Sequence, residues 1–268
     1  MTLFHLFLVA AIQGLTEFLP VSSSGHLILL PELSGMEDQG QVIDVAVHVG
    51  SLLAVILYFR SDVAKAIGGL GRLVRGKIDT QGAFLALCLL VATVPVMGLG
   101  LILHVTGLDS ATRNMAVIGW TMLGFGVLLY WADQRGATHR KAEGWTLKDA
   151  VIMGLWQALA LIPGTSRSGI TITGGRLLGY GREDAARLAM LMSIPTIIAS
   201  GLLLGVGVVA EANADAARDG AIAAVMAFVC ALAALHFMMR LLRSVSFTPY
   251  VIYRVALGLV LLVMAYTT

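Results

Sequence analysis

The sequence predicts an all-α, polytopic integral membrane protein with six transmembrane helices and two re-entrant helical hairpins, arranged as an inverted-topology repeat. Three observations lead to this prediction. Hydrophobic residues make up 58% of the 268 residues and charged residues only 13%, whereas soluble domains carry about 25% charged residues. Six apolar segments are long enough to cross a bilayer, which takes about 20 residues. Two further apolar segments are interrupted by similar turns rich in Pro, Gly and Ser.

Composition also excludes several classes of protein and partner. The low charge excludes an ordinary soluble domain and a disordered chain. A net charge of +2, with no Lys/Arg-rich run, argues against a nucleic-acid partner and leaves the bilayer as the main one. Cys88 and Cys230 lie in apolar runs and are expected to be small buried hydrophobes. No Lys or Arg precedes Arg60, so we expect no signal peptide and a retained N-terminus.

The predicted elements follow from the apolar runs. The six spans are expected at residues 42–59, 83–104, 114–131, 186–209, 221–242 and 250–267. The interrupted segments, 3–31 and 150–178, each consist of two short arms around a turn, which suits a re-entrant hairpin better than a full span. Non-helical backbone at membrane depth is tolerated only inside protein or beside water. Both turns are therefore expected to be internal.

The distribution of charge predicts the orientation. If hairpin 3–31 enters and leaves on the outer side, fifteen of the 18 Lys and Arg residues fall in cytoplasmic segments, namely those of 60–77, 135–148, 176–187 and 240–254. The outer segments are then neutral or acidic, as the positive-inside rule requires. This topology places the site of the first hairpin toward the outer face. The charge distribution supports the orientation more strongly than it supports the first hairpin, because a full span at 3–31 would leave the later loops on the same sides.

The two interrupted segments resemble each other. QGLTEFLPVSSSGH begins at Gln13 and QALALIPGTSRSGI begins at Gln157. Each is followed by three spans, and because three is odd, the second copy would be inserted upside down. The predicted repeats are 1–131 and 150–268, with a site at their interface near the bilayer midplane. The same offset also pairs Ser22 with Ser166, Ser24 with Ser168, and Gly25 with Gly169.

The first motif begins with a carboxylate in apolar surroundings. Gln13 and Glu17 are four residues apart and so share one helix face. A charge at the bilayer centre costs about 2.5–3.5 kcal/mol on insertion scales, so Glu17 is a functional-site candidate, with snorkelling to the outer surface as the alternative. Pro20 is expected to end this arm.

A Ser-rich turn follows. Ser22, Ser23, Ser24 and Gly25 offer hydroxyls and backbone N–H groups ahead of a helix, which is a typical phosphate cradle. His26 follows directly and adds a titratable, nucleophilic ring.

The second motif places a cation at the tip of the second hairpin. Arg is always charged and its planar fork suits phosphate oxygens. A buried Arg167 needs an anion, either Glu17 in a structural ion pair or a phosphate of the substrate. The surrounding hydroxyls favour phosphate. The candidate ligands beside Arg167 are Gly164, Thr165, Ser166, Ser168 and Thr171.

Together the two motifs resemble those of the undecaprenyl-diphosphate phosphatase family (BacA type), over essentially the whole chain. The resemblance implies a bacterial inner-membrane enzyme that hydrolyses undecaprenyl diphosphate, recycles the lipid carrier for peptidoglycan synthesis and confers bacitracin resistance. It also implies that Gln13 and Glu17 form the acidic motif, tied to a divalent cation (Mg²⁺ or Ca²⁺), and that Arg167 with Ser166, Ser168 and Thr171 clamps the diphosphate. Gln13 stands where many members have a second Glu. His48 stands where relatives have Gln, and it could line the site or merely pack, with Asp44 as its partner.

The nucleophile is left open among His26, Ser23 and a water activated by Glu17. We favour His26 with Glu17 orienting it, because both are expected on one turn, and we expect alanine at His26, Glu17 or Arg167 to cut turnover about 100-fold or more. The rival class is a polyprenyl-phosphate transporter or flippase built on the same repeat. A membrane protein without any site would explain neither Glu17 nor Arg167. The sequence leaves open the prenyl chain length, the metal and a homodimer.

Overall fold

The computed structural model describes residues 1–36, 38–107, 114–211 and 214–267. Within these ranges the regular secondary structure is helical apart from one isolated bridge between Arg140 and Tyr180. Six of the described helices are long and apolar enough to cross a bilayer, which confirms the six predicted spans and a multi-pass membrane protein. They are α3 (Gly40–Tyr58), α5 (Gln81–Thr106), α7 (Met115–Arg135), α10 (Arg182–Glu211), α11 (Ala214–Leu241) and α12 (Thr248–Thr267).

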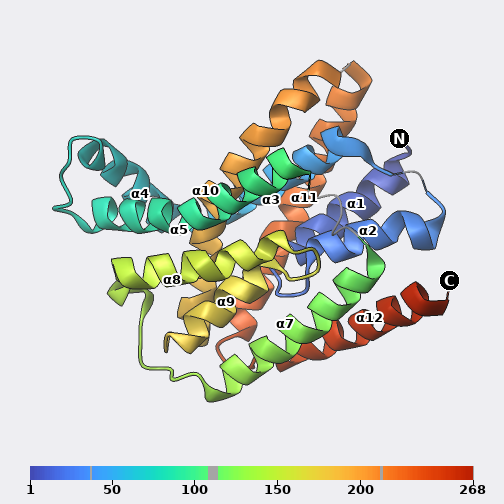
Figure 1. Cartoon of the computed structure of the whole chain (residues 1–268). Coiled ribbons are helices and arrows are strands. Elements are labelled where there is room, and N and C mark those ends of the chain that lie inside the picture. Colours follow the sequence, from blue (N-terminus) through green and yellow to red (C-terminus); the bar gives the residue numbers. More distant parts are fainter. Residues whose placement is uncertain (37, 108–113, 212–213, 268) are drawn as a thin grey trace.

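The two interrupted segments each form two short helices around a turn. The first contains α1 (Leu3–Thr16) and α2 (Ser23–Ser34), and the second contains α8 (Leu147–Ala158) and α9 (Arg167–Leu177). The longest of these arms has 14 residues, about 21 Å at 1.5 Å per residue, which is too short for a 30 Å hydrocarbon core. Both chain ends lie on the right of Figure 1, opposite the loop between α4 and α5. The short paired arms are compatible with two re-entrant hairpins. Their depth in a bilayer stays a prediction.

One boundary differs from the sequence prediction. Helix α1 ends at Thr16, not at Pro20, and Glu17 is its C-terminal cap. Residues 17–20 form turns, with Val21 N–H donating to the Leu19 carbonyl at 2.7 Å. The helix therefore stops before the proline, and Glu17 lies where regular structure ends.

Helix α4 (Arg60–Leu73) was not predicted. Its sequence contains three glycines and several charges, which masks the helical pattern. The helix packs on α5. A Cβ at Gly69 would lie 2.2 Å from the Ala83 nitrogen, so the absence of a side chain allows the two backbones to touch.

The hairpins pack on the opposite halves of the chain. Helix α1 contacts α11, whereas α8 contacts α5; likewise α3 contacts α11 and α10 contacts α5, while α7 and α12 pair with each other. Figure 1 shows α1 beside α11 and α7 along α12. Exchanging the halves turns these contacts into one another, which is compatible with the predicted repeat, whereas α9 packs on α10 and α7 more closely than α2 packs on α3 and α12. The inverted relation and the division at 131 and 150 stay predictions.

Polar contacts fix the start of the second hairpin. Asp149, in the first turn of α8, is buried. Its carboxylate accepts hydrogen bonds from Thr146 Oγ1 at 2.6 Å, Tyr180 Oη at 2.8 Å and Arg140 Nη1 at 3.1 Å. Elsewhere the spans carry exposed apolar side chains, such as Val94, Leu202 and Phe237, which suit contact with lipid tails.

Candidate active site

The two Ser-containing turns have the same local geometry. Ser22 and Ser166 adopt φ angles of 72° and 67°, and they are the only non-glycine residues with positive φ in the described ranges. Each directly precedes a helix, α2 or α9. The Ser22 and Ser24 hydroxyls lie 3.3 Å apart, and those of Ser166 and Ser168 lie 3.2 Å apart. Such backbone conformations are uncommon and cost free energy, which makes a functional role for both turns the natural hypothesis.

Side chains from one turn reach the other. The Ser168 hydroxyl donates to the Leu19 carbonyl at 2.9 Å. Arg167 Nη2 donates to Glu17 Oε1, and the two side chains are only 17% and 6% exposed. The structure thus brings Glu17 and Arg167 together as a buried ion pair, the first of the two predicted partners for this arginine. The surface position considered for Glu17 is wrong, because the residue is buried.

Three further groups surround the second carboxylate oxygen of Glu17. The Ser23 hydroxyl donates to Oε2 at 2.7 Å and the Gln13 amide donates at 2.9 Å. His48 Nε2 lies 3.9 Å from the same oxygen. His48 therefore lines the site, and its Nδ1 is held at 2.7 Å by the backbone carbonyl of Asp44.

His26 lies elsewhere than expected. Its Nδ1 is 2.7 Å from the Ser22 carbonyl, which can only accept, so Nδ1 carries the proton. Its Nε2 lies 2.6 Å from the Tyr253 hydroxyl, and the two rings are stacked with centroids 5.6 Å apart. The expected pairing of Glu17 with His26 is therefore wrong: the bond to Ser22 turns the ring toward α12, and Ser23 takes the place beside Glu17.

The prediction that Arg254 belongs to a cytoplasmic cationic segment is wrong, because this arginine is buried beside the two turns. Its exposed fraction is 0%. The guanidinium donates to the carbonyls of Pro20, Gly164 and Thr165, at 3.4, 3.1 and 2.9 Å. In sequence, an arginine close to the start of an apolar segment looks like an anchor at the membrane surface. The Tyr-Arg pair within α12 is the one feature of the sequence that could have pointed to a role of Arg254 in the site.

Several predicted ligands are buried with unused polar atoms. The hydroxyls of Thr165 and Thr171, the Oε1 atom of Gln13 and Nε of Arg254 have no hydrogen-bond partner in the part of the chain that the structure describes. Buried polar groups are normally paired, so each such atom calls for an explanation.

The other predicted ligands differ in exposure: Ser24 is exposed and Gly25 is buried. Gly164 has a φ of 84°, and a Cβ there would lie 2.3 Å from the Thr121 hydroxyl, so this turn requires glycine.

The sequence is similar to known proteins along almost its whole length. A model of the family described as bacitracin resistance protein BacA matches residues 6–260. The chain belongs to the BacA family. It is 76% identical over 267 residues to an undecaprenyl-diphosphatase of Dinoroseobacter shibae and 73% identical to one of Roseobacter denitrificans, in each case over 100% of both chains. It is also 46% identical to an undecaprenyl-diphosphatase of Saccharophagus degradans, over 96% of each chain.

In this BacA-family chain the donors around Glu17 do not fit a resident divalent cation. Both oxygens of its carboxylate already accept hydrogen bonds, one of them from the positively charged Arg167. Gln13 turns its NH₂ group, not its oxygen, toward Glu17. No group of three His, Cys, Asp or Glu side chains suited to a metal occurs among the described residues. One carboxylate beside a guanidinium supplies too little negative charge for a cation on its own.

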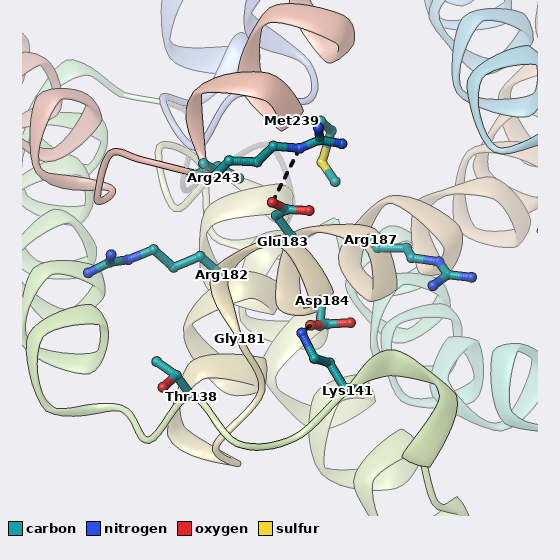
Figure 2. A pocket seen from close by; sticks show the side chains of 10 residues that line it. Thr138, Lys141, Gly181, Arg182, Glu183, Asp184, Arg187, Met239 and Arg243 are labelled. Atoms are coloured by element: carbon teal, nitrogen blue, oxygen red, sulfur yellow. Dashed lines mark ion pairs between the residues drawn. The ribbon is translucent and has the colours of Figure 1, made fainter.

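A separate pocket in this BacA-family chain lies away from both motifs, between the start of α10 and the end of α11 (Figure 2). Its volume is about 360 Å³. Arg243 Nε lies 3.4 Å from Glu183 Oε1, and Lys141 Nζ lies 3.5 Å from Asp184 Oδ2. The two other cations of the lining, Arg182 and Arg187, pair with Asp133 and Asp62. Each of these four cations pairs with a carboxylate, and no residue of either motif lines this pocket.

Proposed function

We propose that this chain hydrolyses undecaprenyl diphosphate to undecaprenyl phosphate and inorganic phosphate, a reaction at a phosphoric anhydride bond. The enzyme would recycle the lipid carrier for peptidoglycan synthesis and so confer resistance to bacitracin. The names of the relatives support the substrate. The observation that carries the chemistry is the 2.7 Å hydrogen bond from the Ser23 hydroxyl to Glu17.

Ser23 and Glu17 are arranged as a nucleophile and its base. A serine hydroxyl is a weak nucleophile unless an adjacent base takes its proton, and this pair lies within the required distance. In the first step Ser23 Oγ would form a bond to the terminal phosphorus while Glu17 accepts the hydroxyl proton. The bond from phosphorus to the bridging oxygen breaks, and the undecaprenyl phosphate leaves with that oxygen, which takes the proton from Glu17.

The second step would release phosphate. Water attacks the phosphorus of phosphoserine, Glu17 accepts a proton from the water, and the Ser23 oxygen leaves and takes that proton. His26 is less suited to attack because its unprotonated nitrogen faces the Tyr253 hydroxyl at 2.6 Å. We propose that this contact orients the ring beside the substrate.

Arg167 would exchange partners during turnover. Free of substrate, it pairs with Glu17. A diphosphate carries more negative charge and offers a bidentate acceptor, which suits the guanidinium fork better than a shared carboxylate oxygen. Moving Arg167 onto phosphate would leave Glu17 free to accept the proton. The unpaired hydroxyls of Thr165 and Thr171, together with Ser22, Ser24, Ser166 and Ser168, would supply donors to the remaining oxygens.

We propose that a divalent cation, Mg²⁺ or Ca²⁺, enters this site only with the diphosphate, whose oxygens would add the negative charge that a single carboxylate lacks. Magnesium is commonly held by one or two carboxylates together with substrate phosphates. We further propose that the enzyme lies in the bacterial inner membrane with the site toward the periplasm, since the cationic segments then face the cytoplasm. A polyprenyl-phosphate transporter would have no need of a serine hydrogen-bonded to a buried carboxylate.

The test is a phosphoenzyme trap with purified protein in detergent. Undecaprenyl diphosphate labelled at the terminal phosphate is mixed with enzyme and quenched within one turnover in denaturant at mildly alkaline pH, where phosphohistidine survives, and part of each sample is then acidified. We expect an acid-stable phosphoserine in the wild type and none in Ser23→Ala, whose phosphate release should fall about 100-fold or more. An acid-labile label that survives Ser23→Ala but is lost in His26→Ala would assign the attack to His26. Wild-type protein that releases no phosphate with any divalent cation would contradict the proposed hydrolysis.

A further inference from the structure

Arg254, on α12, hydrogen-bonds to both turns of the proposed site. One guanidinium nitrogen donates to the Pro20 carbonyl in the first turn, and the other donates to the Gly164 and Thr165 carbonyls in the second. A Cβ at Gly169 would lie 2.8 Å from Arg254 Nη1, so the guanidinium also touches the first turn of α9. A single side chain on α12 thereby contacts both turns.

The charge of Arg254 has no carboxylate opposite it. No Asp or Glu of the described ranges forms an ion pair with it, and its Nε has no hydrogen-bond partner there. Arg176 provides the contrast, because it is also buried but lies 3.1 Å from the Asp133 carboxylate. A buried charge is costly unless it is paired, and three carbonyl dipoles compensate only part of that cost. The missing negative charge is therefore expected to come from outside the chain.

The bonds of Arg254 also set the orientation of peptide groups. In a trans peptide the C=O of one residue and the N–H of the next point in opposite directions. With the Thr165 carbonyl directed at Arg254, the N–H of Ser166 is turned away from it, at the start of α9. Losing the guanidinium would free these peptides to rotate and would loosen Arg167 and Ser168, which follow directly.

We propose that Arg254 is a positioning residue for the diphosphate. Its fork holds the two turns at the spacing where Glu17 and Arg167 meet, and its uncompensated charge attracts the anion that Arg167 binds. This inference rests on the proposed function. It is distinct from direct catalysis, because Arg254 is fully buried behind the turns and acts through their carbonyl groups.

The experiment separates binding from turnover. Binding of methylenediphosphonate, a diphosphate that cannot be hydrolysed, is measured by calorimetry on the full-length protein in detergent, beside kcat and KM for phosphate release. Arg254→Met removes the charge and the fork, whereas Arg254→Lys keeps the charge but cannot bridge three carbonyls. Arg176→Met is the matched control, since it removes a buried arginine at the far end of α9.

We expect Arg254→Met to weaken diphosphonate binding about tenfold or more, as the loss of a charged partner implies. Arg254→Lys should bind within about threefold of wild type but lose about tenfold or more in kcat. Arg176→Met should lower the melting temperature while its diphosphonate affinity stays at the wild-type value. If Arg254→Met does not fold, Arg254→Lys decides, by its loss of kcat at retained affinity.

Two results would overturn the inference: wild-type affinity in folded Arg254→Met, or wild-type kcat in Arg254→Lys. Either would leave hydrolysis by the wild type intact. Conversely, wild-type protein that binds diphosphonate through Arg254 but releases no phosphate would refute the proposed function and not the role of Arg254.

Discussion

Replacing Glu17 by Gln keeps the shape of the side chain and removes its negative charge. The carboxylate receives donors on both oxygens, from Arg167 on Oε1 and from Ser23 and Gln13 on Oε2. Glutamine has one oxygen and one NH₂ group in their place. Whichever way the amide is turned, its NH₂ faces at least one existing donor. The substitution therefore leaves a buried guanidinium or a pair of buried donors without an acceptor.

The expected magnitude follows from this count. A hydrogen bond to a charged group contributes about 1.5–3 kcal/mol, and removing one partner of a buried ion pair costs about 3–5 kcal/mol. We expect Glu17→Gln to lower the free energy of unfolding by about 3–5 kcal/mol, and the loss of the general base to reduce turnover about 10²–10⁴-fold. Urea unfolding and phosphate release, both in detergent, measure the two effects.

Glu143→Gln is the matched control. Glu143 also pairs with an arginine, Arg187, but its side chain is 68% exposed. Exposed ion pairs contribute about 0–1 kcal/mol, so this variant should unfold and turn over almost as wild type does. The reasoning is refuted if folded Glu17→Gln keeps turnover within about tenfold of wild type, or if both variants lose the same stability.

Three further predictions concern pH, packing and metal. Burial opposes the ionisation of Asp149, but its hydrogen-bond donors, led by Arg140, lower its pKa from 3.8 to about 2. A lowered pKa contributes stability that is fully present above the unfolded-state pKa of 3.8 and is lost as pH falls through the folded-state pKa. The advantage of wild type over Asp149→Asn in unfolding free energy should therefore shrink by about 1.1 kcal/mol between pH 7 and pH 3; an advantage independent of pH would contradict this. Gly50→Ala would place a Cβ 2.1 Å from the Ala224 carbonyl oxygen and should destabilise α3 against α11 by about 1–3 kcal/mol in thermal unfolding, whereas Gly98→Ala, with open space around it, should not. EDTA should abolish phosphate release without lowering the melting temperature of substrate-free protein, because the cation is proposed to enter with the diphosphate; a lower melting temperature would indicate a resident metal instead.

Much of the helical layout and part of the site could be predicted from local patterns. Six apolar runs predict the six spanning helices because length and composition decide which segments can cross a bilayer. The spacing of Gln13 and Glu17 predicts their contact because residues four apart share a helix face. The charge of Arg167 in apolar surroundings predicts a nearby anion, and Glu17 provides one.

The remaining features depend on contacts between distant segments. Tyr253 and Arg254 serve the turns from α12, more than 200 residues after the first motif, and an apolar run with one Tyr-Arg pair does not reveal its partner. The place of Ser23 beside Glu17 depends on helix α2 starting at that residue, which in turn depends on the positive φ of Ser22. Helix α4 is missed because its stability comes from close packing on α5, not from its own sequence.

The exchange of helices between halves has a consequence for biosynthesis. Helix α1 is made first, yet its main packing partner, α11, begins only at Ala214. Chains grow from the N-terminus at about 5–20 residues per second, so the first hairpin waits roughly ten seconds or longer before that partner is made. During this interval Glu17 has neither Arg167 nor the burial that α11 helps to provide. The first hairpin is thus expected to reach its final packing only after α11 is made, although it is synthesised first, and a chain truncated before α11 should leave it accessible to protease.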